Sequence, residues 1–312
     1  MIVPVIGSVT QESRSCHWQT TIVMKAWIDN EIVDAELATL PVLDHGLLYG
    51  DGVFEGIRIA HRRIFRLADH IQRLRVSASA IGLRLPQDDA FLTNVVVATA
   101  KAHGSGEAYV RLIVTRGVGA LGVDPSTCAT PSLICIVGPI VLFPEEKRRH
   151  GLALATSSLR RPAFDTLDPR VESLNYLNNV MAKAEALRAG ADEALVLNQA
   201  GRVVEASVAN VFAARDEVLL TPHPNEGALA GLTRQTVIEH ARAEGIEVVE
   251  GSMTRVDLLA ADEVFLTGSG AGLIAVATLD GQPIGKGVES RSVTERMANH
   301  LDQARRTMGE EF

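Results

Sequence analysis

The chain has 312 residues, of which 46% are hydrophobic and 22% charged, a composition typical of a globular protein rather than a disordered one. Thirty Lys and Arg residues stand against 38 Asp and Glu residues, which gives a formal net charge of -8. This balance argues against binding to nucleic acid or to anionic membranes, because both select basic surfaces. The sequence contains no run of about 18 apolar residues, so no membrane-spanning helix is expected.

The cysteines and the first residues indicate the setting of the protein. Cys16, Cys128 and Cys135 form no CxxC pair and no secreted-type disulfide framework, so a reducing, cytoplasmic location is expected. The first two dozen residues lack a basic start and a small-residue cleavage site, so they do not read as a secretory signal. We expect residues 1–24 to be a disordered extension, or an addition from an upstream start codon.

The next part of the chain predicts a small α+β domain over residues 25–138. Apolar residues at helical spacing predict two helices, over Ala68–Ile81 and Gln87–His103. Short apolar runs bounded by turn residues predict the strands of an antiparallel sheet. These runs are Ala26–Ile28, Ile32–Val33, Val53–Arg58, Ile64–Leu67, Ala108–Thr115 and Ser132–Val137.

A second, larger domain is predicted over residues 152–312. The preceding residues, 139–151, combine Pro144 with the charged run Glu145–Arg149, which is typical of an interdomain linker. Helices are expected over Leu174–Ala189, from near Thr233, and over Ser292–Arg306. The expected strands are Leu152–Ser157, Glu193–Leu197, Val203–Ala213, Ile246–Glu250 and Glu263–Leu266.

Several catalytic motifs are absent from the sequence, including the Walker phosphate loop, the H-E-x-x-H zinc pair and the G-x-S-x-G elbow. The nine histidines do not cluster with metal-ligand spacing, so no metal site is expected. A glycine-rich run, Gly268–Gly272, follows an expected strand. The third glycine of a dinucleotide fingerprint would fall at Leu273, so that motif fails. The backbone amides of the run can still converge on a phosphate or a carboxylate.

Two further features are suited to binding an anion. Gly231–Arg234 begins an expected helix, where backbone amides and the hydroxyl of Thr233 would form a phosphate site. An ordinary helix cap at Thr233 is the alternative. Arg58 ends an apolar strand, where a plain surface arginine is the alternative. Together with the glycine-rich run, these features favour one phosphorylated cofactor.

Glu205 lies in the middle of an expected apolar strand. A buried carboxylate is costly unless a cationic partner compensates its charge. One explanation is a salt bridge inside the fold. The other is a carboxylate that keeps the ring nitrogen of a cofactor protonated.

The run Asp44–Arg58 resembles the class IV aminotransferases, the pyridoxal-phosphate enzymes of fold type IV. Its segment Phe54–Arg58 is most similar to that of the branched-chain amino acid aminotransferases. The resemblance implies two domains with the cofactor between them, and a homodimer or a higher homo-oligomer. It also implies amino acid and 2-oxo acid substrates, with 2-oxoglutarate as the acceptor. Further matching segments are Tyr109–Arg111, Thr115–Gly117, Leu174–Asn179, Gly201–Phe212, Gly231–Arg234 and Glu263–Gly268.

The resemblance implies a role for each matched position. For pyridoxal or pyridoxamine 5'-phosphate, it places Glu205 at the pyridine nitrogen and Tyr176 at the phenolic oxygen. The positions that it implies for the cofactor phosphate are Arg58, Leu232, Thr233 and Ser269. Those near the substrate are Tyr49, Tyr109, Arg111, Gly270 and Ala271.

One departure from the family pattern concerns catalysis. The family carries its Schiff-base lysine just before the Asn-Tyr-Leu-Asn motif, and here that position is Glu172. Lys183 matches a non-catalytic lysine of the family. The chain would therefore be an impaired aminotransferase with an engineered glutamate, a natural lysine-lacking homologue that binds the cofactor non-covalently, or a non-catalytic cofactor-binding protein. A D-amino acid or (R)-amine transaminase is the alternative substrate branch.

Overall fold

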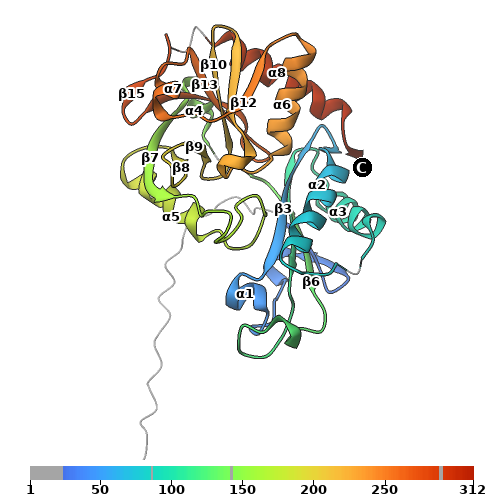
Figure 1. The fold of residues 1–312 in the computed structure, drawn as a ribbon. Coiled ribbons are helices and arrows are strands. Elements are labelled where there is room, and N and C mark those ends of the chain that lie inside the picture. Colours follow the sequence, from blue (N-terminus) through green and yellow to red (C-terminus); the bar gives the residue numbers. More distant parts are fainter. Residues whose placement is uncertain (1–23, 86, 141–142, 288–290) are drawn as a thin grey trace, which may run out of the picture.

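The computed structural model describes residues 24–85, 87–140, 143–287 and 291–312. The expected extension over residues 1–24 lies outside the described residues, apart from Met24. Two sheets, each with its own helices and apolar core, make up the described chain (Figure 1). This mixed α/β arrangement confirms the predicted fold class. Within the described part of the chain, no helix is long and apolar enough to cross a membrane.

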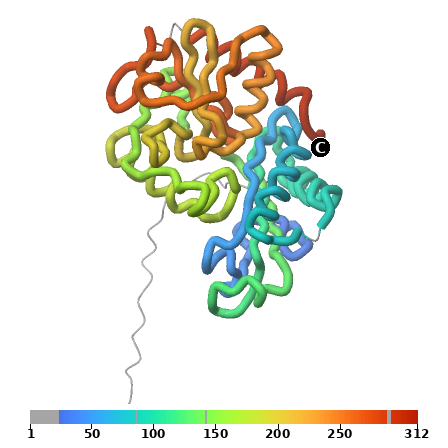
Figure 2. Tube along the Cα trace, in the orientation of Figure 1, coloured from blue at the N-terminus to red at the C-terminus, as the bar shows by residue number. Residues whose placement is uncertain are grey.

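The first sheet has seven strands, and every pairing in it is antiparallel, as predicted. Its order is β16-β4-β3-β5-β6-β1-β2. The last residues of the chain therefore return to the first sheet, where β16 pairs with β4, and Figure 2 shows the C-terminus beside the blue and cyan segments. The strands are β1 (Lys25–Ile28), β2 (Glu31–Asp34), β3 (Gly52–Ala60), β4 (Arg63–Ile64), β5 (Ala108–Thr115), β6 (Ser132–Gly138) and β16 (Glu310–Glu311).

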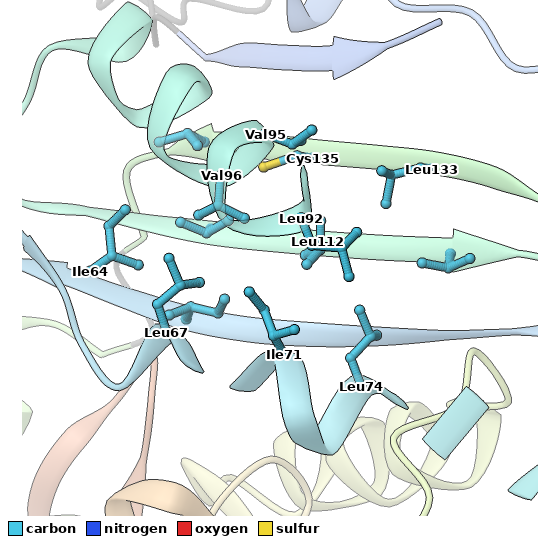
Figure 3. Packing of buried hydrophobic residues seen from close by; sticks show 14 of the residues in the cluster. Ile64, Leu67, Ile71, Leu74, Leu92, Val95, Val96, Leu112, Leu133 and Cys135 are labelled. Atoms are coloured by element: carbon cyan, nitrogen blue, oxygen red, sulfur yellow. The ribbon is translucent and has the colours of Figure 1, made fainter. Parts of the chain in front are cut away.

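Two helices, α2 (Leu67–Ala80) and α3 (Asp89–His103), cover this sheet. Each lies within two residues of its predicted bounds. Their apolar stripes meet the alternate inward residues of the strands, as Figure 3 shows for Ile71 and Leu74 of α2 against Leu112 of β5. Burying each such side chain stabilises the fold by about 1.5–3 kcal/mol. Helix α2 packs mainly against β3, a strand that carries site residues, and α3 packs mainly against β6 and β1.

The second sheet has nine strands and mixes parallel and antiparallel pairs. Its order is β12-β11-β10-β13-β14-β7-β8-β9, and β15 pairs with β14. The ring of Phe212 stacks on that of Phe265 across neighbouring strands, with centroids 5.0 Å apart. The strands are β7 (Leu152–Arg160), β8 (Glu193–Leu197), β9 (Val203–Ala206), β10 (Asn210–Arg215), β11 (Val218–Pro222), β12 (Val248–Gly251), β13 (Glu263–Gly268), β14 (Gly272–Leu279) and β15 (Gln282–Pro283).

Helices surround the second sheet and connect its strands. The predicted helices are present as α5 (Leu177–Arg188), α6 (Leu232–Ala243) and α8 (Ser292–Thr307). The shorter elements here are α4 (Glu145–His150), α7 (Arg255–Leu259) and the 3-10 turn η3 (Pro224–Glu226). Helix α1 (His45–Tyr49) and the 3-10 turns η1 (Ala35–Leu37) and η2 (Pro125–Thr127) instead connect strands of the first sheet.

The structure differs from the sequence predictions in several places. The strand expected over Ile64–Leu67 is only Arg63–Ile64 (β4), because Leu67 already begins α2. The strand expected over Val203–Ala213 is two strands, β9 and β10, because the chain turns at residues 207–209 with the amide of Ala206 bonded to the carbonyl of Ala209 at 2.7 Å. This turn lets β9 pair with β8 while β10 pairs with β13. In the segment 139–151, the charged run forms α4, which begins after Pro144 and ends before Gly151 (φ +89°).

Candidate active site

A cavity of about 180 Å³ lies between the two sheets. β3 and β5 contribute side chains from one side, and the turn after β9, the start of α6 and the loop after β13 contribute from the other. The segment before α5 closes it. Nine of the residues singled out from the sequence line this cavity: Tyr109, Arg111, Glu172, Tyr176, Glu205, Leu232, Thr233, Ser269 and Gly270.

Glu205 is a buried carboxylate with three donors around it. Arg161 donates to Oε1 at 2.7 Å, while the side-chain amide of Asn210 and the backbone amide of Leu229 donate to Oε2 at 3.0 and 3.1 Å. Burial raises the pKa of Glu205, and the positive charge of Arg161 opposes that rise. The internal salt bridge considered from the sequence is therefore present, and the same carboxylate also faces the cavity.

The start of α6 offers donors to an anion. Leu232 and Thr233 are its first residues, so their amides have no acceptor within the helix. Gly231 precedes them and provides no side-chain cap. A Cβ at Gly231 would collide with the side chain of Asn210, so only glycine fits here. The helix dipole and these free amides favour a negatively charged group.

Arg73 supplies the positive charge next to this helix start, and the sequence prediction had missed it. From α2 it forms two bonds to Glu55, from Nε to Oε1 at 2.9 Å and from Nη2 to Oε2 at 2.8 Å. Its Nη1 donates to the carbonyl of Ala230 at 3.1 Å, and Arg73 lines the cavity. His70, one turn earlier, also bonds to Glu55 at 2.6 Å.

Arg58, the arginine predicted to bind phosphate, does not line this cavity. Its Nη2 pairs with Glu107 at 2.7 Å, and it borders a second pocket together with Ala271. Arg58 lies outside the cavity because it stands two residues beyond Gly56 on the same face of β3, about 7 Å further along the strand. Arg73 is therefore the arginine placed to meet an anion at Leu232 and Thr233. The spacing of His70 and Arg73, which places both on one face of α2, was the only signal in the sequence.

Glu172 projects a buried carboxylate into the cavity. Its backbone is fixed by two bonds, since its amide donates to the Ser77 hydroxyl at 3.2 Å and its carbonyl accepts from the amide of Phe54 at 2.9 Å. The hydroxyl of Tyr176 donates to Glu172 Oε1 at 3.3 Å. Burial raises the pKa of Glu172 to about 7, with Arg73 opposing the rise and Glu55 adding to it.

No lysine is among the described residues that line the cavity. Lys183 lies further along α5, where its ammonium group donates to Glu193 at 2.8 Å and to the carbonyl of Asp192. Lys183 is thus held by other partners.

The aromatic wall of the cavity comes from Phe54, Tyr109 and Tyr176. The guanidinium group of Arg111 lies over the Phe54 ring at 4.2 Å from its centroid, and burial raises the pKa of Tyr109. A Cβ at Gly56 would collide with the hydroxyl of Tyr109, so this glycine lets the tyrosine reach the cavity.

Two predicted substrate residues lie outside the cavity. Ala271 borders the second pocket. Tyr49 lies on α1, where its hydroxyl accepts a bond from the amide of Gly122 at 2.7 Å. Cavity residues that the sequence analysis did not single out include Thr267, whose buried hydroxyl has no partner among the described residues, and Arg161 and Asn210 beside Glu205.

Comparison with known proteins identifies the family. Residues 52–279 match the family model for class IV aminotransferases. The chain therefore belongs to the class IV aminotransferase family. A Methanocaldococcus jannaschii relative, named "Putative branched-chain-amino-acid aminotransferase", is 44% identical over 261 residues, which cover 84% of this chain and 90% of the relative.

Solved structures agree with this assignment. The branched-chain amino acid aminotransferase of Escherichia coli has a TM-score of 0.84 at 31% identity and covers 88% of this chain and 92% of its own. The T.th. branched-chain amino acid aminotransferase with pyridoxamine 5'-phosphate has a TM-score of 0.83 at 33% identity. The match covers 90% of this chain and 95% of that structure's chain. Within the family, the chain is therefore similar to branched-chain aminotransferases.

Proposed function

We propose that this chain is a pyridoxal-phosphate-dependent aminotransferase that acts on branched-chain or related amino acids, with 2-oxoglutarate as the acceptor, and that Glu172 limits its catalysis. The observation that carries the proposal is the pairing, in one cavity, of an anion site at the start of α6 with a fixed carboxylate at Glu205.

The donor set of the cavity fits the cofactor. The amides of Leu232 and Thr233, the Thr233 hydroxyl and the guanidinium group of Arg73 would hold its phosphate. Ser269 and the unpartnered hydroxyl of Thr267 lie in the same cavity and can add donors. Arg73 takes the role first expected of Arg58.

The ring end of the cofactor would lie against Glu205 and Tyr176. Three donors already hold both oxygens of Glu205, so the carboxylate is positioned to accept a hydrogen bond from a ring N–H. The Tyr176 hydroxyl would bond to the phenolic oxygen. When bound, the cofactor supplies the electron sink and carries the amino group.

Glu172 would take the place of the family's lysine. It cannot bond covalently to the cofactor, and its charge faces an anionic ligand. A glutamate can accept hydrogen bonds from an amine or pair with its ammonium form. We therefore expect the amine form of the cofactor to bind more tightly than the aldehyde form. Protonated Glu172 could also move a proton slowly, because its pKa of about 7 lies near the working pH.

The substrate would meet the wall formed by Tyr109, Arg111 and Phe54, with its carboxylate near the amide of Gly270. The T.th. enzyme has been solved with 4-methylvaleric acid and with N-(5'-phosphopyridoxyl)-L-glutamate. These two compounds carry a branched aliphatic chain and a glutamate skeleton, which supports a branched-chain donor and a 2-oxoglutarate acceptor here.

We further propose that the chain acts as a homodimer. Tyr49 lies away from the cavity, and apolar side chains of α1 and of the loop after β5 are exposed around it. Leu47 is 61% exposed and Leu121 is 77% exposed. A second copy covering this surface would bury these side chains and could bring Tyr49 to the neighbouring cavity.

The experiment that tests the function is a calorimetric titration of the purified protein with pyridoxamine phosphate and, separately, with pyridoxal phosphate. We expect both to bind reversibly, the amine form more tightly. Absence of binding at millimolar cofactor would refute the proposal. The codon at position 172 in the source genome separates an engineered glutamate from a natural one.

A further inference from the structure

A second pocket lies beside the active-site cavity and is rich in arginine. Arg58 of β3, Arg148 of α4 and Arg305 of α8 line it, and Glu145 is the one acidic residue among the described residues that line it. Its volume is about 390 Å³. Three guanidinium groups from three separate elements thus face one hollow.

The positive charge of this pocket is incompletely compensated. Nε and Nη2 of Arg305 are buried and have no hydrogen-bond partner among the described residues, and the same holds for Nε of Arg58. Nη2 of Arg58 forms an ion pair with Glu107 at 2.7 Å. Asp302, one turn before Arg305, bonds instead to His61 at 2.9 Å and to Arg306 at 2.9 Å. Buried donors without acceptors are costly, so a ligand that supplied acceptors would be stabilised here.

The electrostatic surroundings of Arg305 agree with this geometry. Burial, together with the neighbouring charges of Arg58 and Arg148, lowers the pKa of Arg305 to about 10, whereas Asp302 and Glu107 act in the opposite direction. An anion in the pocket would relieve the repulsion among the three arginines.

The pocket shares a wall with the active site. Ile140 and Gly270 line both hollows, while Ala271 and Gly272 line only the second. Arg148 Nη1 donates to the carbonyl of Ala271 at 3.1 Å. A Cβ at Gly272 (φ +72°) would lie 3.3 Å from Nη1 of Arg305, so this glycine leaves room for the guanidinium group.

We propose that Arg58, Arg148 and Arg305 form a second oxyanion-binding site, separate from the cofactor cavity, that takes a small carboxylate or phosphate from solution. Guanidinium groups recognise both ions through paired N–H donors. Because Arg148 bonds to the carbonyl of Ala271 and Arg305 lies beside Gly272, the bound anion would also hold the loop Gly270–Gly272 in place.

The test is isothermal titration of the purified protein, first saturated with pyridoxamine phosphate so that the cofactor site is blocked, and then repeated without it. The probes are inorganic phosphate and succinate, a dicarboxylate that cannot accept an amino group. With the cofactor site blocked, we expect saturable binding of one anion per chain. Without the cofactor, a second anion can also bind at the start of α6. The tighter of the two probes identifies the source of the ligand as phosphate or carboxylate.

Two variants and a control assign the binding to this pocket. Arg305→Gln and Arg148→Gln should each weaken anion binding by about tenfold or more, because each removes a charged donor. Arg149→Gln alters the next residue of α4, which does not line the pocket, and should bind as the unmodified chain does. Arg305→Gln should also keep or raise the melting temperature without anion, since it removes an uncompensated buried charge. If Arg305 had a purely structural role, Arg305→Gln would lower the melting temperature.

Two results would overturn the proposal. One is the absence of saturable anion binding in the unmodified protein. The other is unchanged binding in both Arg305→Gln and Arg148→Gln. Neither result depends on whether the chain transaminates, because binding is measured without turnover and the Arg305→Gln and Arg148→Gln variants assign it to this pocket.

Discussion

The hydroxyl of Tyr176 donates to Oε1 of Glu172 across 3.3 Å inside a buried cavity. The two side chains lie one helical turn apart in sequence and point into the same space as Glu205. Burial raises the pKa of both Glu172 and Tyr176, which favours their neutral forms. Position 172, where we propose that a glutamate replaces the family's lysine, therefore carries a carboxyl group whose pKa burial raises to about 7.

Replacing Glu172 by lysine should restore covalent attachment of the cofactor. Glu172→Lys places an amine beside Tyr176 and should raise the rate of the half-reaction with L-leucine at least about a hundredfold. Borohydride treatment with pyridoxal phosphate, followed by peptide mass spectrometry, should find the adduct in the peptide containing position 172 in this variant only. Glu172→Gln is the matched control, since it removes the charge without adding an amine. An unmodified chain that already transaminates at an ordinary rate would contradict the assignment.

Glu172 should make the cofactor-free protein less stable as pH rises. Its pKa is about 7 in the fold and 4.5 without the fold, so the folded state binds more protons between these values. The contribution of Glu172 to the free energy of unfolding is therefore fully present below pH 4.5 and is lost as pH rises through 7. Glu172→Gln should be more stable than the unmodified protein above pH 7, by up to about 3 kcal/mol.

Urea denaturation at pH 5 and pH 8 measures this difference. The increase in the free energy of unfolding caused by Glu172→Gln should be larger at pH 8 than at pH 5. The exposed Glu36 provides a control, because Glu36→Gln should give the same difference at both pH values. An equal gain from Glu172→Gln at pH 5 and pH 8 would show that the carboxyl group does not titrate in this range.

Arg73 rather than Arg58 should decide the affinity for the cofactor phosphate. Removing Arg73 alone would leave Glu55 unpaired, so the informative variant is Arg73→Gln combined with Glu55→Gln. It should weaken pyridoxamine phosphate binding about tenfold or more, because it removes a charged donor. Arg58→Gln, outside the cavity, should change that affinity less than threefold, as measured by calorimetry. A larger loss of affinity in Arg58→Gln than in the Arg73 and Glu55 double variant would instead identify Arg58 as the phosphate ligand.

The exposed apolar surface around α1 should hold two chains together. Leu47→Asp with Leu121→Asp should weaken the homodimer at least tenfold, since each buried leucine contributes about 1.5–3 kcal/mol. Sedimentation velocity at micromolar concentration measures the shift to monomer. Val256→Asp, which alters an equally exposed residue of α7, should leave the dimer intact. An unmodified chain that sediments only as a monomer would end the dimer proposal.

Branched-chain amino acids should be the preferred donors once a lysine is in place. In Glu172→Lys, L-leucine, L-isoleucine or L-valine should react faster than D-alanine or (R)-1-phenylethylamine. The physical reason is the wall of Phe54, Tyr109 and Tyr176, which can bury an aliphatic side chain. Single-turnover absorbance changes of the bound cofactor measure each donor. Faster reaction with D-alanine or the amine would place the chain in another substrate branch of the family.

The sequence by itself determined the longer helices, many of the strands and most of the residues of the cavity. Apolar spacing placed α2, α3 and α8 to within two residues, because amphipathic periodicity records which face of a helix is buried. Glycines and a threonine marked the start of α6, since free helix amides need a residue without a blocking side chain. The resemblance in the segments around Glu172, Tyr176 and Glu205 singled out residues that now line one cavity.

Tertiary structure decided which arginine meets the anion. Arg58 lies on the same face of β3 as Phe54 and Gly56. It stands two residues beyond Gly56, however, and this position lies beyond the end of the cavity. Arg73 reaches the cavity from a helix because Glu55, on the opposite face of β3, fixes its guanidinium group. A strand position or a helix position in sequence does not specify how far a side chain lies from a loop in the other sheet. Only the packing of α2 between β3 and the start of α6 sets that distance.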